Sequence, residues 1–578
     1  MIIEITAFMG ESPRTIPRLL PQSMAQQAFN TKLENGALKP IHLARFETGL
    51  SQPAKTIYHH RGEWLGWPGV VDVVPAPVAE DRLYFTGDGA PKMMVNGEIV
   101  NLALEAPTGK PVASISETPD PALSSTIIYA YTYVTDLGEE SEPSPLSDGI
   151  LWSPGIPVTL RGFSQPPESR RVTTMRIYRS QTSSTGNTQL YFIAERPAGV
   201  GDFIYDDLPI VEPITSSDFN PPPDDLQGIT TLPNGMLAAF SGKRLYFSEP
   251  YIPHAWPEKY VLTTDYEIVG LGAFGSSVAI LTTGMPYVAS GTAPENMVME
   301  KLEINLPCIA ASGIVDLGYA VAYPSHNGLV SISSSGASVV TKGVLTRDQW
   351  LQMNPYSFIG GQFDGRWMAS YAYTNEGGEG TRGIIIIDLT GDQTFIIRSS
   401  DYATAMHYSI ESGSLYLLRG NTEIYEWDSI SQPFGEQLWR SKKFVINTDV
   451  NFGALLIEGD DVATAAQKKT MQDKATQIMA SNRALMAKHR SGGEIGGVAI
   501  GVIPLGASLL DVVDMDPASL AVSVYADDRL VFTTSKLGKV IRLPAGFMAR
   551  TWEIEVRGNI QVSRLMMATS ASEIAEGS

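Results

Sequence analysis

The chain has 578 residues, enough for two to four domains, and 43% of them are hydrophobic, which excludes wholesale disorder. Acidic residues outnumber basic ones 62 to 42, and the net charge of −20 excludes a protein that grips nucleic acid phosphates with most of its surface. The single cysteine, Cys308, excludes an intramolecular disulfide framework and a multi-cysteine metal site, and its apolar neighbours favour a packed residue over a nucleophile.

Residues 1–60 are rich in proline and are expected to form an irregular N-terminal wrapping or bridging segment, with one helix-like stretch near Ser23–Leu33. The next segment, residues 61–106, alternates short apolar runs such as Arg82-Leu-Tyr-Phe-Thr with Gly-containing turns. This pattern predicts a small antiparallel meander, which we interpret as the first blade or blades of a propeller. No export signal and no membrane-spanning stretch is predicted.

Residues 107–216 predict an inserted β-sandwich. Tyr129, Tyr131 and Tyr133 alternate and should face one side of a strand. About seven short strands in roughly 110 residues are typical of a sandwich. A turn-rich acidic stretch, residues 136–145, interrupts them, and a proline-rich linker at 218–225 follows.

Residues 226–440 contain a repeat of an apolar strand, a Gly-containing turn and a second strand. The repeats centre near residues 238, 279, 321, 369 and 416. Steps of about 40–50 residues are typical of four-stranded propeller blades. Arg82–Thr86 also resembles Arg244–Ser248, so we expect the ring to close through the N-terminal strands. The predicted fold is mainly β: a β-propeller with an inserted sandwich and a C-terminal β-domain, residues 441–578, that carries one long helix.

That helix, Val462–Arg490, is the most unusual stretch of the chain because it is basic within an acidic protein. Its six cations stand against one acid, Asp473, and we single them out as a DNA or subunit contact: Lys468, Lys469, Lys474, Arg483, Lys488 and Arg490. An ordinary packed helix with a solvated basic side explains the same pattern. Both interpretations stay open at this stage.

No residue pattern predicts catalysis, a cofactor or a metal site. The only adjacent histidines, His59 and His60, would point to opposite faces of a strand. Gly270–Gly275 matches GxGxxG, but a strand-like run follows where a dinucleotide site needs a helix, so a blade-to-blade turn is favoured. Asp511, Asp514 and Asp516 lack the glycine spacing of a calcium loop and favour a solvated turn. The sequence therefore predicts a protein that is not an enzyme.

Both ends of the chain resemble a known family. The opening Phe8-Met-Gly-Glu-Ser-Pro-Arg-Thr-Ile-Pro-Arg-Leu-Leu-Pro, followed by Ala25, Ala28, Asn30 and Gly36–Pro40, is similar to the start of structural proteins from short-tailed bacteriophages. The close, Leu543–Val562, is similar to the last hairpin of the same group, and Tyr129–Pro145 resembles a fibronectin-type-III-like module of virion proteins. The family is the tail nozzle, also called tail tubular protein B or tail stabilisation protein.

The resemblance implies a hexameric ring in the virion tail, assembled in the host cytoplasm, that meets an adaptor or portal-side protein and a tail fibre or spike. It implies a channel that retains and ejects DNA without binding it tightly. The alternative is a receptor-binding or polysaccharide-binding propeller of the virion, with or without depolymerase activity, whose sugar sites would be lined by exposed aromatic residues. Five tryptophans are the candidates for that role, although each suits a blade core equally well: Trp64, Trp67, Trp350, Trp367 and Trp427.

Overall fold

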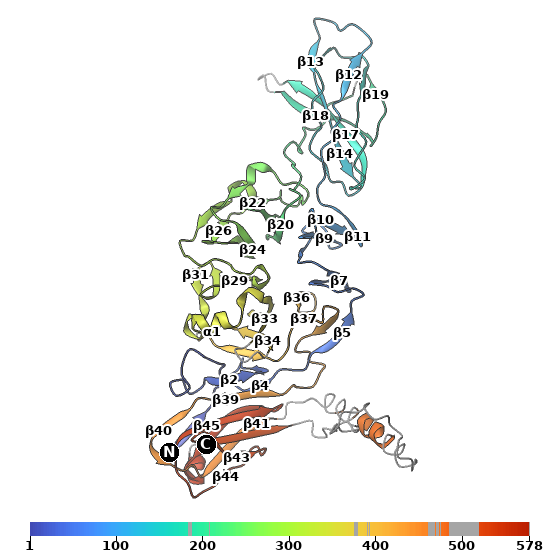
Figure 1. The fold of residues 1–578 in the computed structure, drawn as a ribbon. Coiled ribbons are helices and arrows are strands. Elements are labelled where there is room, and N and C mark those ends of the chain that lie inside the picture. The colour runs from blue at the N-terminus through green and yellow to red at the C-terminus, as the bar shows by residue number, and fades with distance from the viewer. Residues whose placement is uncertain are drawn as a thin grey trace. The chain divides into compact units, whose positions relative to one another are not determined.

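The computed structural model describes residues 1–182, 188–206, 208–374, 380–389, 391, 393–460, 469, 473, 476–484 and 519–576 (Figure 1). Over these residues the fold is mainly β. The helical elements are η1 (Glu258–Tyr260), η2 (Pro294–Asn296), η3 (Ala311–Gly313), η4 (Val340–Gly343), α1 (Arg347–Gln352), η5 (Pro355–Ser357), α3 (Ala571–Glu576) and residues 469, 473 and 476–484. No helix within the described ranges is both long and apolar enough to cross a membrane.

The chain divides into two compact units, Met1–Pro53 with Val339–Ser578, and Ala54–Ser338. We call them the terminal unit and the central unit. The first and last residues of the chain belong to the same unit, so the central unit interrupts the terminal one in sequence.

The central unit holds four-stranded antiparallel meanders of the kind that forms propeller blades. A hairpin of β6 (Thr56–His60) and β7 (Glu63–Trp67) precedes them. The blade strands are β8 (Asp72–Pro75), β9 (Arg82–Thr86), β10 (Lys92–Val95) and β11 (Glu98–Asn101); β20 (Gln227–Thr231), β21 (Leu237–Ser241), β22 (Arg244–Phe247) and β23 (Leu262–Thr263); β24 (Ile268–Phe274), β25 (Ser277–Thr282), β26 (Tyr287–Ser290) and β27 (Val298–Lys301); and β28 (Val315–Asp316), β29 (Ala320–Ser325), β30 (Gly328–Ser333) and β31 (Gly336–Val339).

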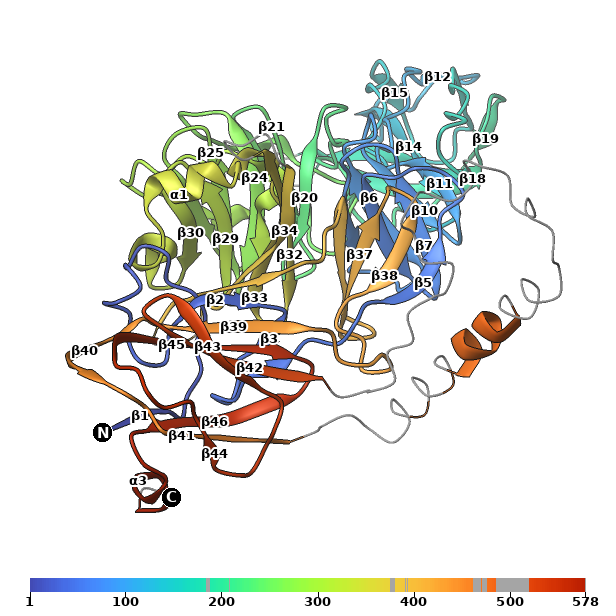
Figure 2. The ribbon, with the colours of Figure 1, turned by 60° about the horizontal axis from the view of Figure 1, so that its bottom comes forward.

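Successive blades of the central unit pack face to face through apolar side chains. One core joins Tyr84 and Met93 of the first blade to Leu237 and Ala239 of the second. A second core joins the blade of β20–β23 to that of β24–β27. Figure 2 shows β24 between β20 and β29, and the contacts between these strands agree with that arrangement.

The inserted β-sandwich encloses a core of its own. Its strands are β12 (Val112–Ile115), β16 (Val158–Arg161) and β19 (Phe203–Tyr205); β13 (Ser125–Ile127) and β15 (Ile150–Trp152); and β14 (Tyr129–Thr135), β17 (Val172–Thr182) and β18 (Thr188–Pro197). Tyr129, Tyr131 and Tyr133 all enter this core, as their alternation predicted. Trp152 and Met175 meet them from neighbouring strands.

The terminal unit contains two further blades, and β32 packs on β36 between them. Their strands are β32 (Ile359–Phe363), β33 (Arg366–Thr374), β34 (Gly380–Ile387) and β35 (Ile396–Ser399); and β36 (Ala405–Ser409), β37 (Ser414–Arg419), β38 (Glu423–Glu426) and β5 (Arg45–Gly49). The five sequence repeats lie on β21, β25, β29, β33 and β37, which is the second strand of a blade in each case.

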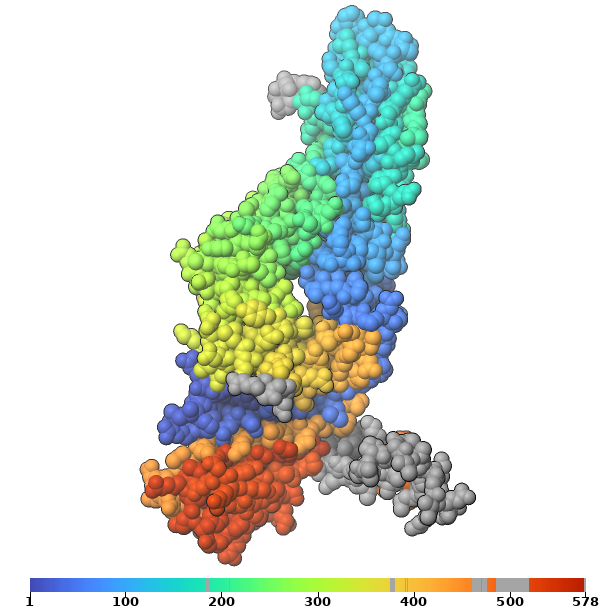
Figure 3. Space-filling view, in the orientation of Figure 1, coloured from blue at the N-terminus to red at the C-terminus, as the bar shows by residue number. Residues whose placement is uncertain are grey.

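One sheet of the terminal unit continues from a blade into the C-terminal β-domain. From β35 it runs through β2 (Ala25–Phe29), β39 (Gln437–Ser441), β45 (Ala549–Gly558), β42 (Leu520–Ala526) and β43 (Arg529–Thr534), and β40 (Phe444–Val450) also pairs with β45. A second sheet orders β1 (Ile2–Ile5), β46 (Gln561–Ala568), β41 (Ala454–Asp460) and β44 (Ile541–Arg542), and β3 (Thr31–Lys32) pairs with β4 (Lys39–Pro40). In Figure 3 the blue N-terminal residues border the orange and red C-terminal ones.

The predicted fold class is confirmed, but three details of the prediction were wrong. Ser23–Leu33 contains strands β2 and β3 where a helix was expected, because its backbone pairs with β39 and β35. The N-terminal segment is not irregular, since it contributes strands to several sheets. Arg82–Thr86 is the second strand of its blade and Arg244–Phe247 is the third strand of the next one, so the two similar sequences do not occupy equivalent positions in their blades. The closure of the ring and the five-part domain division stay predictions.

Candidate functional site

The predicted basic helix is described only in part. Lys469 and Arg483 are helical and exposed, and Asp473 is exposed between them. Four of the six predicted contact residues lie outside the described residues: Lys468, Lys474, Lys488 and Arg490. The acidic cluster Asp511, Asp514 and Asp516 lies outside them as well. The contact proposed for this helix therefore stays a prediction.

The other motifs of the sequence fall into the core. Gly270 and Gly272 lie inside β24, where a Cβ would meet Ile314 and Val321 at 2.4 and 2.5 Å, so close packing explains them. Of the glycines in the motif, only Gly275 lies in the turn between β24 and β25, with φ +55°. Cys308 is buried, and burial raises the pKa of its thiol to about 12. Among the described residues no cluster of His, Cys, Asp or Glu suits a metal ion.

Four of the five candidate sugar-binding tryptophans are core residues. Trp350 and Trp367 are fully buried and tilt against each other with ring centroids 6.4 Å apart. Trp67 and Trp427 are also buried, and Trp64 is half-buried. These five side chains form no exposed aromatic platform for a polysaccharide.

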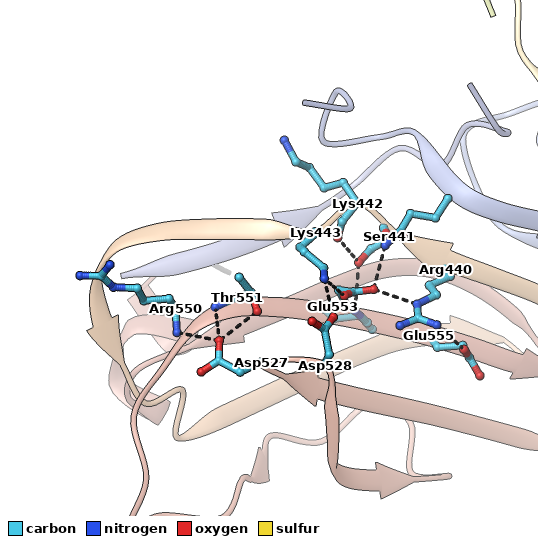
Figure 4. Close-up of polar contacts among 12 residues, drawn as sticks. Arg440, Ser441, Lys442, Lys443, Asp527, Asp528, Arg550, Thr551, Glu553 and Glu555 are labelled. Atoms are coloured by element: carbon cyan, nitrogen blue, oxygen red, sulfur yellow. Dashed lines mark hydrogen bonds and ion pairs between the residues drawn. The ribbon is translucent and has the colours of Figure 1, made fainter. Parts of the chain in front are cut away.

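A group of charged side chains in the C-terminal β-domain surrounds Glu553 on β45 (Figure 4). Its side chain is 3% exposed and accepts hydrogen bonds from Arg440 Nε and Gln26 Nε2, both at 2.8 Å. Lys443 Nζ lies 3.5 Å from the other Glu553 oxygen and also pairs with Asp528. The buried carboxylate is thus compensated by cations from β39 and the residues after it, which fixes these strands together.

The turn between β42 and β43 completes this group. Asp527 and Asp528 both have positive φ, 45° and 63°, as a two-residue hairpin turn of type I′ requires. Asp527 Oδ1 accepts hydrogen bonds from Thr551 N and Oγ1, both at 2.9 Å, and these bonds lower the pKa of Asp527. The Lys443 ammonium lowers the pKa of Asp528. The carboxylates of Asp527 and Asp528 stay ionised at neutral pH and bind groups on neighbouring segments, so the role of this group of charges is to stabilise the fold.

A second buried group fixes the inserted sandwich to its neighbouring blades, and we call it the sandwich anchor. The Arg170 guanidinium forms an ion pair with Glu139 and donates to Asn101 O at 3.0 Å. His254 Nε2 lies 2.9 Å from Glu140 O, and its Nδ1 lies 3.8 Å from Glu139 Oε1. Sequence reasoning noticed the acidic stretch 136–145 but missed this role, because its partners come from distant parts of the chain.

Comparisons with known proteins identify no family for this chain. No family model and no curated protein matches it. Among solved structures it is similar to the Dos1 propeller, with 11% identity and a TM-score of 0.24 over 63% of this chain and 92% of that one. The N-terminal domain of Nup159 gives 9% identity and a TM-score of 0.24 over 49% and 70% of the two chains. PorZ of Porphyromonas gingivalis gives 12% and 0.22 over 65% of this chain and 42% of that one. Likeness this distant carries no argument about function.

Proposed function

We propose that this chain is a structural protein of a short-tailed bacteriophage virion, a subunit of the tail nozzle ring. In this role six copies enclose a channel below an adaptor or portal-side protein. A tail fibre or spike docks on the ring, and double-stranded DNA is held in the channel and later leaves through it. The protein itself performs no chemistry on the DNA.

One observation carries the proposal: the two stretches that resemble the nozzle family at either end of the chain form one structure. Phe8 packs edge-on against Trp439 at 4.9 Å between ring centroids, and Trp439 lies in the strand that pairs with β45. Leu38 N donates to Val562 O at 2.8 Å, and Val562 N donates back to Leu38 O at 2.9 Å. The N-terminal and C-terminal stretches that resemble the family thus pack and pair with each other in one substructure.

The charge of the chain supports the same role. A ring that lets DNA pass must not bind it tightly, and each chain carries −20. Six copies would carry about −120, which gives a narrow channel a strongly repulsive field. The alternative, a polysaccharide-binding propeller, loses its sequence support because the tryptophans assigned to it are buried or half-buried.

Native mass spectrometry and negative-stain imaging of the purified full-length chain test the proposal. We expect a closed ring with a central pore, whose mass is six times that of the chain. A stable monomer or trimer that binds or cleaves capsular polysaccharide would contradict the nozzle and support the alternative.

A further inference from the structure

The family-like segment Ser12–Leu20 forms an exposed loop that we call the N-terminal loop. Its tip presents two apolar side chains, Ile16 and Leu19, which are 49% and 66% exposed. Arg14 and Arg18 alternate with them along the loop and are exposed too. Leu20, in contrast, is buried and ends the exposed stretch. The loop therefore combines apolar and cationic groups on one surface of the terminal unit.

The loop is held in one conformation from several sides. At its start Glu11 is buried and pairs with Arg398 at 2.9 Å. Arg14 N donates to Val344 O at 2.9 Å, and Lys443 N donates to Pro17 O at 3.1 Å. Prolines at positions 13, 17 and 21 restrict the backbone further. A loop ordered in advance loses little entropy on binding, which suits it to docking.

The cations of the loop belong to a larger basic patch. Arg14 Nη1 donates to Lys342 O at 2.8 Å, so Lys342 of η4 lies beside the loop, and Arg347 follows at the start of α1. The side chains of these four cations are exposed, and none forms an ion pair with any residue that the structure describes: Arg14, Arg18, Lys342 and Arg347. Lys442 extends away from the Glu553 group (Figure 4). The neighbouring cations Arg440 and Lys443, in contrast, are both paired.

The composition of the chain indicates what such a patch would meet. The terminal unit holds 27 basic and 31 acidic residues, whereas the central unit holds 15 and 31, a net charge of −16. The central unit of a second copy therefore carries a net negative charge that attracts a basic patch. Exposed Ile16 and Leu19 favour a protein over DNA, because apolar side chains flanked by arginine are typical of protein interfaces and contribute nothing to phosphate contacts.

We propose that the N-terminal loop, with Lys342, Arg347 and Lys442, docks onto an acidic face of a second copy of this chain. The basic patch of one copy and the acidic face of the next are different surfaces. Such a contact is heterologous and closes into a ring when the rotation between copies permits it. The inference deepens the proposed nozzle function and rests on its ring, for which it supplies the surface that joins the subunits.

Two variants of the full-length protein test the surface. The first reverses three cations: Arg18→Glu, Lys342→Glu and Arg347→Glu. The second removes the apolar tip: Ile16→Ser and Leu19→Ser. The control reverses three exposed cations of the same unit that lie outside the patch, and it changes the net charge by the same amount: Lys536→Glu, Lys539→Glu and Arg542→Glu.

Assembly is measured by native mass spectrometry and sedimentation at about 50 to 500 mM salt, with melting temperature as the check on folding. We expect both patch variants to weaken association by about 10- to 100-fold or more while they melt like the wild type, and the control to assemble normally. Wild-type association should weaken as salt rises.

Other results would contradict the docking surface, the ring or the proposed partner. Patch variants that assemble like the wild type, or a control that dissociates equally, would overturn the docking surface and leave the ring intact. A wild-type chain that never associates would overturn the ring itself and the surface with it. Loss of binding to a short DNA duplex in the first variant, with assembly unchanged, would identify nucleic acid as the occupant and overturn the proposed partner.

Discussion

Replacing Arg170 with methionine tests whether the sandwich anchor holds the inserted domain on its blades. The side chains of Arg170 and Glu139 are 1% and 8% exposed, and methionine keeps much of the volume while it removes the charge. Among the described residues, Glu139 would keep only a long hydrogen bond from Thr135 Oγ1, at 3.4 Å, and the distant Nδ1 of His254. A buried carboxylate that loses its cation in this way typically costs about 3–5 kcal/mol.

The free energy of unfolding of the central unit should therefore fall by about 3–5 kcal/mol. At about 2 °C per kcal/mol for a unit of this size, its melting temperature should fall by about 6–10 °C. Urea unfolding followed by tryptophan fluorescence and by proteolysis measures the change without assuming that the whole chain unfolds in one step.

A double-mutant cycle with Glu139→Gln isolates the pair. We expect the double variant to be more stable than the sum of the single losses predicts, by about 2 kcal/mol or more. Arg161→Met is the matched control, because its ion pair with Asp202 in the same sandwich is exposed and should contribute less than about 1 kcal/mol. Additive losses, or an Arg170→Met loss as small as that of the control, would refute the anchor.

Three further predictions concern His254, Gly272 and the basic helix. Burial lowers the pKa of His254 although Glu139 opposes the shift, so the imidazole binds a proton more readily in the unfolded chain than in the folded one. The free energy of unfolding should therefore fall as the pH drops below about 6.5. His254→Gln should reduce this pH dependence, which unfolding experiments between about pH 7.5 and 5 measure. Gly272→Ala should cost about 1–3 kcal/mol by denaturant unfolding, because the new methyl group meets Val321, whereas Gly69→Ala, with open space around it, should be nearly neutral. Replacing three cations of the basic helix with Glu should weaken ring assembly or genome retention while the melting temperature barely changes: Lys468, Lys469 and Lys474. Wild-type assembly and retention in this variant would mean that these cations form an ordinary solvated surface.

The repeating architecture could be predicted because it depends on local pattern. The second strands of the blades, such as β25 and β29, are buried along nearly their whole length, so each appears in the sequence as an apolar run followed by a turn. The alternation of Tyr129, Tyr131 and Tyr133 is likewise a property of one strand with one face in the sandwich core.

The features that the sequence did not predict depend on distant partners. Ala25–Phe29 has no strong strand pattern, and its state comes from pairing with Leu438–Ser441, more than 400 residues later. The acidic stretch 136–145 has the composition of a solvated turn, but two of its glutamates are buried: Glu139 pairs with Arg170, and Glu140 pairs with Arg176 and accepts a hydrogen bond from Tyr178. The basic patch was missed for the same reason, since Arg14 meets Lys342 from 328 positions away.

The pairing of β1 with β46 has a consequence for how the protein is made. Ile2 meets Ala568 and Ile5 meets Leu565, so β1 leaves the ribosome long before β46, the strand with which it pairs, has been synthesised. Contacts separated this far along the chain slow folding and leave an unpaired edge exposed during synthesis. The central unit, by contrast, is complete once Ser338 has emerged, and its blades can fold first. We therefore expect chains truncated before β46 to retain a folded central unit but to aggregate through their unpaired N-terminal strands.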